Sequence, residues 1–259
     1  MQQISHQQFA TLKERFLPDR PGPLVGLHVL QTGYGACFVE RWPDPKAILI
    51  ETDKAVTVTL AGDPLLFQPD DLRAHVTAFI DAPTPFIPLL RTTFPDLVVW
   101  DRVIYALTNK PRFARPAHLT IRRLDPSDTQ ALQNLSAESS WISNPWGGPA
   151  GLAMSGYAWG AFNGARLVAV ANSFFLGDRY EEVGVVTEPE FRGLGLSGAC
   201  AGALCEEIQA RGRIPSWGTS PDNLASIRVA EKLGFTFQRN DYLYVVGIEV
   251  PEPAKRVDV

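Results

Sequence analysis

Cysteine is scarce in this chain of 259 residues, and so are the features typical of secreted or membrane proteins. The three cysteines, Cys37, Cys200 and Cys205, are odd in number and form no C-x-x-C pair, which excludes a disulfide framework and indicates reduced thiols. No apolar run approaches the length that spans a bilayer, and residues 1–17 lack the apolar core of a signal peptide. We therefore expect a cytoplasmic protein without a membrane partner.

The chain also lacks an excess of positive charge. Its formal net charge is -4, whereas binding to nucleic-acid phosphates requires a clustered basic face, so we expect no nucleic-acid partner. His28, His75 and His118 show no ligand spacing with cysteines or carboxylates, so we expect no metal. What remains is a hydrophobic content of 45%, enough for one large globular domain or two ordinary ones.

The first part of the chain has a mixed α and β pattern. Helical spacing occurs at residues 6–16 and again after Asp70, and residues 95–107 combine a strand-like start with a possible helix. Strand-like runs bounded by Gly, Pro and Asp cover residues 24–31, 36–41, 47–52 and 55–62. The basic, proline-containing segment from Lys110 to Pro116 predicts a boundary between an N-terminal α/β domain, residues 1–115, and a second domain, residues 116–259.

The second part is more regular. Asn163-Gly164 joins two strands into a hairpin over residues 156–176, and Asp125 with Pro126 begins a helix. Residues 140–151 are expected to form an irregular loop. The remaining pattern predicts strands at residues 118–124, 180–188 and 214–220, helices at 196–212 and 223–234, and a final strand pair at 237–250. This order predicts a mixed α/β fold in which an antiparallel hairpin sheet continues into βα units.

A glycine-rich turn lies where the strand 180–188 gives way to a helix. Free backbone N–H groups and the helix dipole make such a turn an anion site. The Walker pattern is absent, because no Gly-Lys-Ser/Thr follows. Gly193, Gly195 and Gly198 also match the G-x-G-x-x-G of nicotinamide-dependent oxidoreductases, but they follow a hairpin and not the first strand of a parallel sheet. A further alternative is that these glycines serve only tight helix–sheet packing.

Two signatures resemble those of the GNAT acyltransferase superfamily. Arg192-Gly193-Leu194-Gly195-Leu196-Ser197 matches its pyrophosphate loop, with Ser197 where the family has Gly or Ala, and residues 223–235 match its second signature. The resemblance covers residues 118–246 and implies a GNAT-like acyl-CoA N-acyltransferase fold. The strand Trp217–Thr219 and the N-terminal segment look more narrowly like the zwittermicin-resistance type. This leaves open that residues 1–115 are a degenerate GNAT-like half that shapes an acceptor cleft or a dimer contact.

The resemblance implies an acyl-CoA co-substrate, most simply acetyl-CoA, and transfer of its acetyl group to a primary amine of a small molecule by direct attack. Glu182 matches a carboxylate that acts as base in some members, and a backbone N–H near Val186 would stabilise the oxyanion. The positions that correspond to the family's cofactor contacts are Val185, Val186, Thr187, Arg192, Gly193, Leu194, Gly195, Leu196, Ser197, Gly198, Asn223 and Ser226.

The general acid and the acceptor site stay open. Many family members carry Tyr at the position of Ala230, so the proton for the thiolate would come from water, Ser220 or Tyr244. The same gap raises the alternative of a non-catalytic, acyl-CoA-binding regulatory protein. For the acceptor we expect an aromatic wall, or else a set of loop anchors, made by Trp141, Trp146 and Tyr157. A homodimer is a further expectation.

Overall fold

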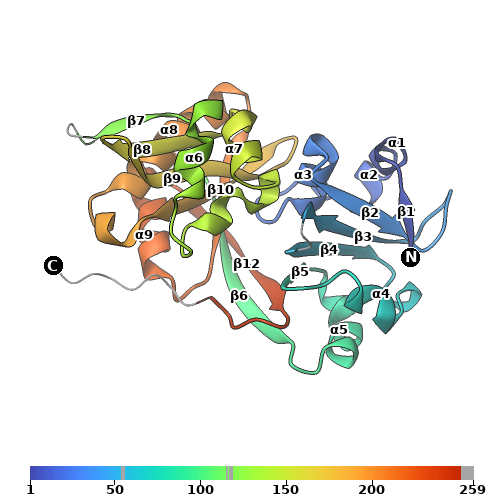
Figure 1. Cartoon of the computed structure of the whole chain (residues 1–259). Helices are drawn as coiled ribbons and strands as arrows, with labels where there is room; N and C mark the ends of the chain where they lie inside the picture. The colour runs from blue at the N-terminus through green and yellow to red at the C-terminus, as the bar shows by residue number, and fades with distance from the viewer. Residues whose placement is uncertain (54–55, 115, 117–118, 252–259) are drawn as a thin grey trace.

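A twelve-stranded sheet is the backbone of the molecule in the computed structural model, which describes residues 1–53, 56–114, 116 and 119–251 (Figure 1). Its strand order is β1-β2-β3-β4-β5-β12-β6-β11-β10-β9-β8-β7. The strands are β1 (Gln2–Ile4), β2 (Gly35–Val39), β3 (Ala47–Thr52), β4 (Thr57–Gly62), β5 (Phe79–Asp81), β6 (Val98–Ala106), β7 (Thr120–Arg123), β8 (Ala158–Asn163), β9 (Arg166–Leu176), β10 (Tyr180–Thr187), β11 (Ile214–Thr219) and β12 (Thr236–Val245).

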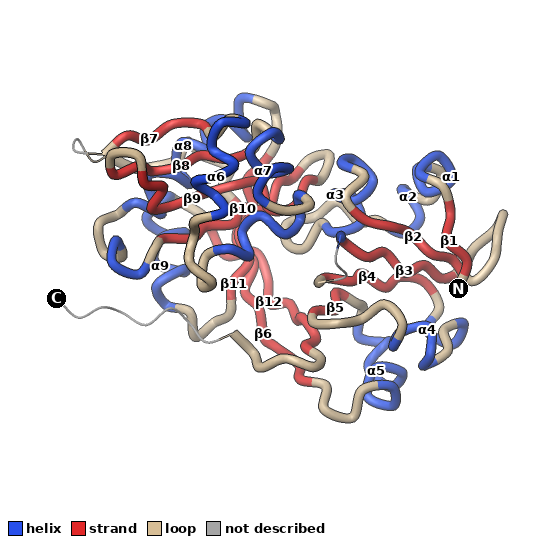
Figure 2. Tube along the Cα trace, in the orientation of Figure 1, coloured by secondary structure: helices blue, strands red, loops and turns tan. Residues whose placement is uncertain are grey.

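The helices flank this sheet, as the tube in Figure 2 shows. The α-helices are α1 (His6–Ala10), α2 (Lys13–Phe16), α3 (Val25–Thr32), α4 (Pro69–Arg73), α5 (Ile87–Thr93), α6 (Thr129–Gln133), α7 (Pro149–Ser155), α8 (Leu196–Ala210) and α9 (Leu224–Leu233). Short 3-10 helices are η2 (Pro64–Leu66), η3 (Thr84–Phe86), η4 (Pro126–Asp128), η5 (Ser140–Trp146) and η6 (Pro189–Phe191). The mixed α/β class expected from the sequence is confirmed.

Two apolar clusters cover opposite faces of the sheet around β10. Val183 packs with Cys200 and Leu204 of α8 in one cluster. Val186 packs with Ile142 of η5 and Leu152 of α7 in the other. Because successive side chains of a strand point to opposite faces, the even-numbered residues of β10 up to Val186 lie on the face that η5 and α7 cover.

The sheet runs without a break across the predicted domain boundary. Strand β6, from the first part of the chain, lies between β11 and β12 and pairs antiparallel with both. Strand β12 in turn pairs with β5. The division into residues 1–115 and 116–259 therefore stays a prediction about domains, with β6 belonging to the sheet of the second part.

Several expected elements differ from the structure. Residues 24–31 form helix α3 and not a strand. Apart from His28 and Gln31 this run is apolar, so its periodicity does not distinguish a buried strand from a buried helix, and Gly33 closes the helix at a φ of 75°. The helical pattern of residues 6–16 is divided between α1 and α2. Residues 140–151 form η5 and the start of α7 in place of an irregular loop.

The structure confirms the expected hairpin and the expected cap at Asp125, but not the expected final strand pair. The hairpin of β8 and β9 is confirmed, with its turn at Gly164 and Ala165, one residue later than expected. The Asp125 side chain accepts a hydrogen bond from the Ser127 backbone N–H, which confirms its capping role. The expected final strand pair is one long strand, β12, because its partners β5 and β6 come from the first part of the chain.

Candidate active site

Strands β10 and β11 separate in the middle of the sheet. They pair in parallel only from Tyr180 opposite Ile214 to Glu182 opposite Ser216, although β10 continues to Thr187 and β11 to Thr219. Where this pairing ends, the register between β10 and β9 shifts between Glu182 and Val183. This shift is a β-bulge, and its extra residue, which bends the strand, lies in β9. The edge of β10 that carries Val185, Val186 and Thr187 is therefore open to an extended ligand that adds to it like a strand.

The glycine-rich turn leads from this open edge to the start of α8. Gly195 is the N-cap of α8 at a φ of 76° and provides no side-chain cap, so the first backbone N–H groups of the helix are free to bind an anion. Gly193 has a φ of 82°. A Cβ atom added at Gly193, Gly195 or Gly198 would meet no atom within 4 Å. These glycines face open space, so tight helix–sheet packing does not account for them.

Side chains of the turn are held by neighbours. The hydroxyl groups of Thr187 and Ser197 lie 2.7 Å apart and connect the end of β10 to the first turn of α8. Arg192 forms an ion pair of 2.6 Å with Glu138, and its Nε donates to the Thr187 carbonyl. The exposed Leu194 lies between the two glycines. No sequence pattern indicates Glu138, which lies 54 residues before Arg192.

Glu182 lies where the two strands separate. Its side chain is nearly withdrawn from solvent, and no described residue within hydrogen-bonding distance satisfies its Oε2 atom. Burial raises the pKa of Glu182 to about 7, with Asp81 and Asp241 adding to the rise and Arg102 opposing it. A carboxyl group with this pKa is divided between its two protonation states at neutral pH, which suits a proton acceptor.

The surroundings of Glu182 come from strands far apart in the sequence. Arg102 of β6 lies directly opposite Asp241 of β12, and Asp241 forms an ion pair of 2.6 Å with Arg239. Gly218 of β11 lies between Glu182 and Arg102. Our sequence interpretation identified Glu182 but did not identify Arg102, Asp241, Arg239 or Gly218. The available signal was Arg102 itself, a charge between Trp100 and Ile104 on a face of β6 that is otherwise apolar.

The second signature forms the turn into α9. The side chain of Asn223 caps this helix by accepting from the Ser226 backbone N–H at 3.1 Å. The Ser226 hydroxyl accepts a hydrogen bond of 2.9 Å from the indole N–H of Trp217. Both side chains therefore have structural partners, and their contact with a cofactor stays a prediction.

The candidates for the general acid are in different places. Ala230 is fully buried in the cluster beneath α8 and α9. Tyr244 is also fully buried, but in the N-terminal core beside Ile80 and Leu90, and the structure does not bring it to the glycine-rich turn. Ser220 directly follows β11, and β11 borders the opening. Of Ser220 and Tyr244, Ser220 is therefore the one that lies beside the opening.

The three expected acceptor aromatics differ in exposure. Trp146 is buried, donates its indole N–H to the Ser173 carbonyl and stacks on Tyr157 at 5.3 Å, which is the geometry of a loop anchor. Trp141 is 41% exposed and contacts Phe174 edge to face. Trp141 is therefore the member of this set that remains available at the surface.

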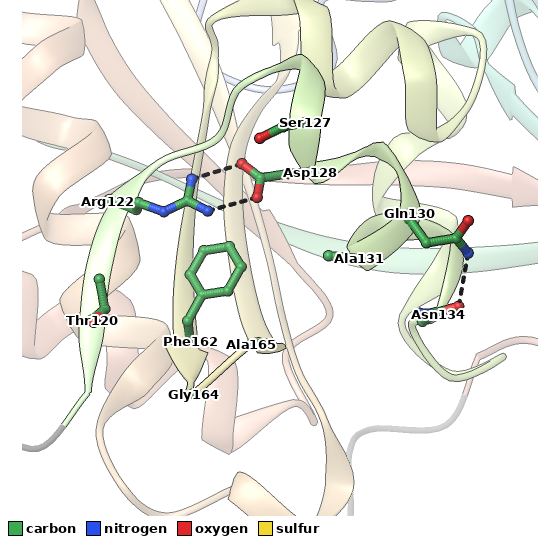
Figure 3. A pocket seen from close by; sticks show the side chains of 10 residues that line it. All are labelled: Thr120, Arg122, Ser127, Asp128, Gln130, Ala131, Asn134, Phe162, Gly164 and Ala165. Atoms are coloured by element: carbon green, nitrogen blue, oxygen red, sulfur yellow. Dashed lines mark hydrogen bonds and ion pairs between the residues drawn. The ribbon is translucent and has the colours of Figure 1, made fainter.

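One hollow of the described residues lies away from the glycine-rich turn and from Glu182. It measures about 430 Å³ between β7, β8 and α6, and Arg122 and Asp128 form a bidentate ion pair in its wall (Figure 3). A narrow cavity of about 40 Å³ lies closer to Glu182, because Asp81 and Arg239, which both act on Glu182, are among its lining residues.

The histidines, the cysteines and possible metal or membrane features of the described residues complete the description. They contain no group of three His, Cys, Asp or Glu side chains that could hold a metal, and no helix long and apolar enough to cross a membrane. His28 and His75 contact protein groups, and His118 lies outside the described residues. All three cysteines are free and buried, and burial raises the pKa of the Cys37 and Cys200 thiols to about 12.

A sequence model described as GNAT acetyltransferase matches residues 23–244. The chain belongs to this family. It is 41% identical over 199 residues to an uncharacterized N-acetyltransferase in the mutA 5′ region of Streptomyces virginiae, covering 76% of this chain and 83% of the relative. It is 24% identical over 266 residues to the uncharacterized N-acetyltransferase YdfB of Bacillus subtilis (strain 168), covering 95% and 99% of the two chains.

The fold has a counterpart among solved structures. A GCN5-related N-acetyltransferase-like protein from Streptococcus suis 89/1591 is similar with a TM-score of 0.71 and 20% identity, over 92% of this chain and 98% of the other. This likeness shows the GNAT fold, and the family match together with the two relatives shows the class of N-acetyltransferase. The family match covers residues 23–244, so it includes most of the N-terminal part as well as nearly all of the region 118–246 that carried the resemblance.

Proposed function

We propose that this N-acetyltransferase takes the acetyl group of acetyl-CoA and transfers it to a primary amine of a small molecule by direct attack. One observation carries the proposal: the open edge of β10 ends in a turn whose free N–H groups face empty space. A ligand with an anionic end and an extended, amide-containing arm fits this pair of features.

The cofactor contacts follow from that arrangement. The backbone N–H groups of residues 192–198 would hold the pyrophosphate, and the open edge at residues 185–187 would bind the pantetheine arm. Asn223 and Ser226 would border the arm from the start of α9. Bound acetyl-CoA supplies an activated thioester carbonyl.

Glu182 would act as the base. An amine attacks only when neutral, so Glu182 takes the proton that leaves the amine nitrogen as the N–C bond forms and the C–S bond breaks. A backbone N–H near Val186 would stabilise the oxyanion. Because Ala230 has no hydroxyl, the departing thiolate takes its proton from water or from Ser220.

The partners and the location are part of the same proposal. We expect a cytoplasmic protein, where its three thiols stay reduced, with a small-molecule acceptor and without nucleic acid, membrane or metal. A homodimer and an acceptor contact at Trp141 also stay predictions.

The cofactor site is tested by Gly195→Glu. The new carboxylate stands at the turn where the pyrophosphate is expected, so we predict that acetyl-CoA binding weakens by roughly 100-fold or more in calorimetric titration. Gly212→Glu is the matched control, because Gly212 also has a φ of 76° and empty surroundings but follows the opposite end of α8. Equal affinities of the two variants, both folded by circular dichroism, would contradict the assignment.

A further inference from the structure

The guanidinium of Arg102 has no assigned task in the mechanism above. It is partly buried on β6 and lies over the Trp100 ring at 4.4 Å. Among the described residues, no hydrogen bond or ion pair within 4 Å engages its five N–H donors. An arginine fork that is withdrawn from water and left without an acceptor is suited to a planar anion such as a carboxylate.

Gly218 keeps the space beside this guanidinium open. A Cβ atom at Gly218 would lie 3.0 Å from Glu182 Oε1, 3.4 Å from Ile104 Cδ1 and 3.8 Å from Arg102 Nη2. The backbone of Gly218 is outside the left-handed region, so its conformation does not require glycine. The missing side chain instead leaves room for the Glu182 carboxylate, which lies close against β11 at the point where it converges with Arg102.

The other charged groups of the cluster have partners of their own. Arg239 forms its ion pair with Asp241 and also donates to the Pro21 carbonyl. Asp81 accepts a hydrogen bond from Thr59 at 3.4 Å. Of the two described arginines that act on Glu182, Arg102 and Arg239, Arg102 is thus the one left for a ligand, while the nearby carboxylates disfavour a doubly charged anion such as phosphate.

We propose that Arg102 binds the carboxylate of the acceptor while the amine of the same molecule faces Glu182, so that the preferred acceptors are amino acids. This inference rests on the proposed function. Glu182 Oε1 and Arg102 Nη2 both lie within 4 Å of one point beside Gly218, so they suit a molecule whose amine and carboxylate are only one or two carbon atoms apart. It assigns Arg102 as a specificity-determining residue and Gly218 as the residue that leaves it room.

The test compares pairs of amines that differ only in the carboxylate: leucine with 3-methylbutylamine, and phenylalanine with 2-phenylethylamine. Acetyl transfer from acetyl-CoA is measured with the wild type, Arg102→Gln, and Arg91→Gln, which removes the same charge from the exposed surface of α5. For the amino acids we expect Arg102→Gln to lower kcat/KM by roughly 10- to 100-fold, mainly through KM, because a charge-assisted pair is lost. For the amines without a carboxylate, and for Arg91→Gln, we expect changes below about threefold.

A pH series separates binding from a simple effect on Glu182. The guanidinium of Arg102 lowers the pKa of Glu182, so Arg102→Gln raises that pKa. The rise of kcat/KM with pH, which follows the ionisation of Glu182, therefore moves to higher pH for every amine. The comparison is therefore made on the alkaline plateau, where Glu182 is ionised in both proteins. An equal loss for both members of each pair on that plateau would overturn the inference and leave the proposed function intact.

Gly218→Ala provides a second variant that should fold, because alanine is no worse than glycine in a strand. It should reduce kcat/KM for the amino acids more than kcat/KM for the matched amines without a carboxylate, while the acetyl-CoA affinity measured by calorimetry stays unchanged. Unchanged selectivity in Gly218→Ala would count against the inference. A wild type that acetylates the simple amines but neither amino acid overturns the inference alone, whereas a wild type that acetylates none of them, nor any other small amine, overturns the proposed function as well.

Discussion

At the scale of single residues, Glu182 combines deep burial with an unsatisfied oxygen atom. We predict that kcat/KM rises with pH about a midpoint near 7, because only the ionised carboxylate accepts the proton of the amine. Glu182→Gln should remove this limb and lower kcat/KM by roughly 10²- to 10⁴-fold. A pH–rate series with Glu182→Gln and with Glu190→Gln, an exposed control on η6, measures the effect. A limb that persists in Glu182→Gln would remove Glu182 as the base.

The sequence could predict the residues that local motifs carry and no others. Gly193, Gly195 and Glu182 belong to one continuous stretch from β10 to α8, where the glycine pattern and the resemblance to the family indicated them. Arg102 and Asp241 meet only because β6 and β12 pair over a separation of more than 130 residues. No pattern within a short window encodes such a pairing.

At the scale of elements, α3 is held to the second part of the molecule through His28. The Nε2 atom of His28 lies 2.8 Å from the Pro145 carbonyl, and Nδ1 accepts from the Leu176 backbone N–H at 3.2 Å. Only the neutral ring with its proton on Nε2 satisfies both contacts. Burial accordingly lowers the pKa of His28 to about 4.

We predict that this contact weakens in acid. The unfolded chain binds a proton at His28 from about pH 6.5 downwards and the folded chain only near pH 4, so stability is lost as the pH falls through this window. His28→Gln should be less stable than the wild type at pH 7.5 by about 2–4 kcal/mol, and the difference should narrow by pH 4.5. Urea unfolding at both pH values measures it, and a difference that does not change with pH would contradict the neutral, buried ring.

The elements also show where local sequence is ambiguous. The helices α8 and α9 and the hairpin of β8 and β9 carry clear periodicity or turn residues, and they form as expected. Helix α3 was mistaken for a strand because it is buried on nearly all sides and offers no polar face. Its neighbours β3 and β9, and not its own sequence, decide its conformation.

At the scale of the whole molecule, the position of β6 makes the second part depend on the first. A chain shortened to residues 116–259 would leave the edges of β11 and β12 unpaired and would lack Tyr105 and Leu107 from the core beneath α8. We predict that this fragment is largely unfolded or aggregated. Circular dichroism and size-exclusion chromatography, with the full chain as control, measure this. A monomeric fragment with cooperative unfolding would show that residues 116–259 are an independent domain.

The measurement that tests the central claim most directly is thiol release from acetyl-CoA by the purified full chain, with and without a panel of small primary amines, at a pH above 8. At that pH Glu182 is ionised, so the account predicts amine-dependent release matched by an equal amount of N-acetylated product. Acetyl-CoA that binds to the chain without release for any amine of the panel would contradict the account and favour a non-catalytic, acyl-CoA-binding protein.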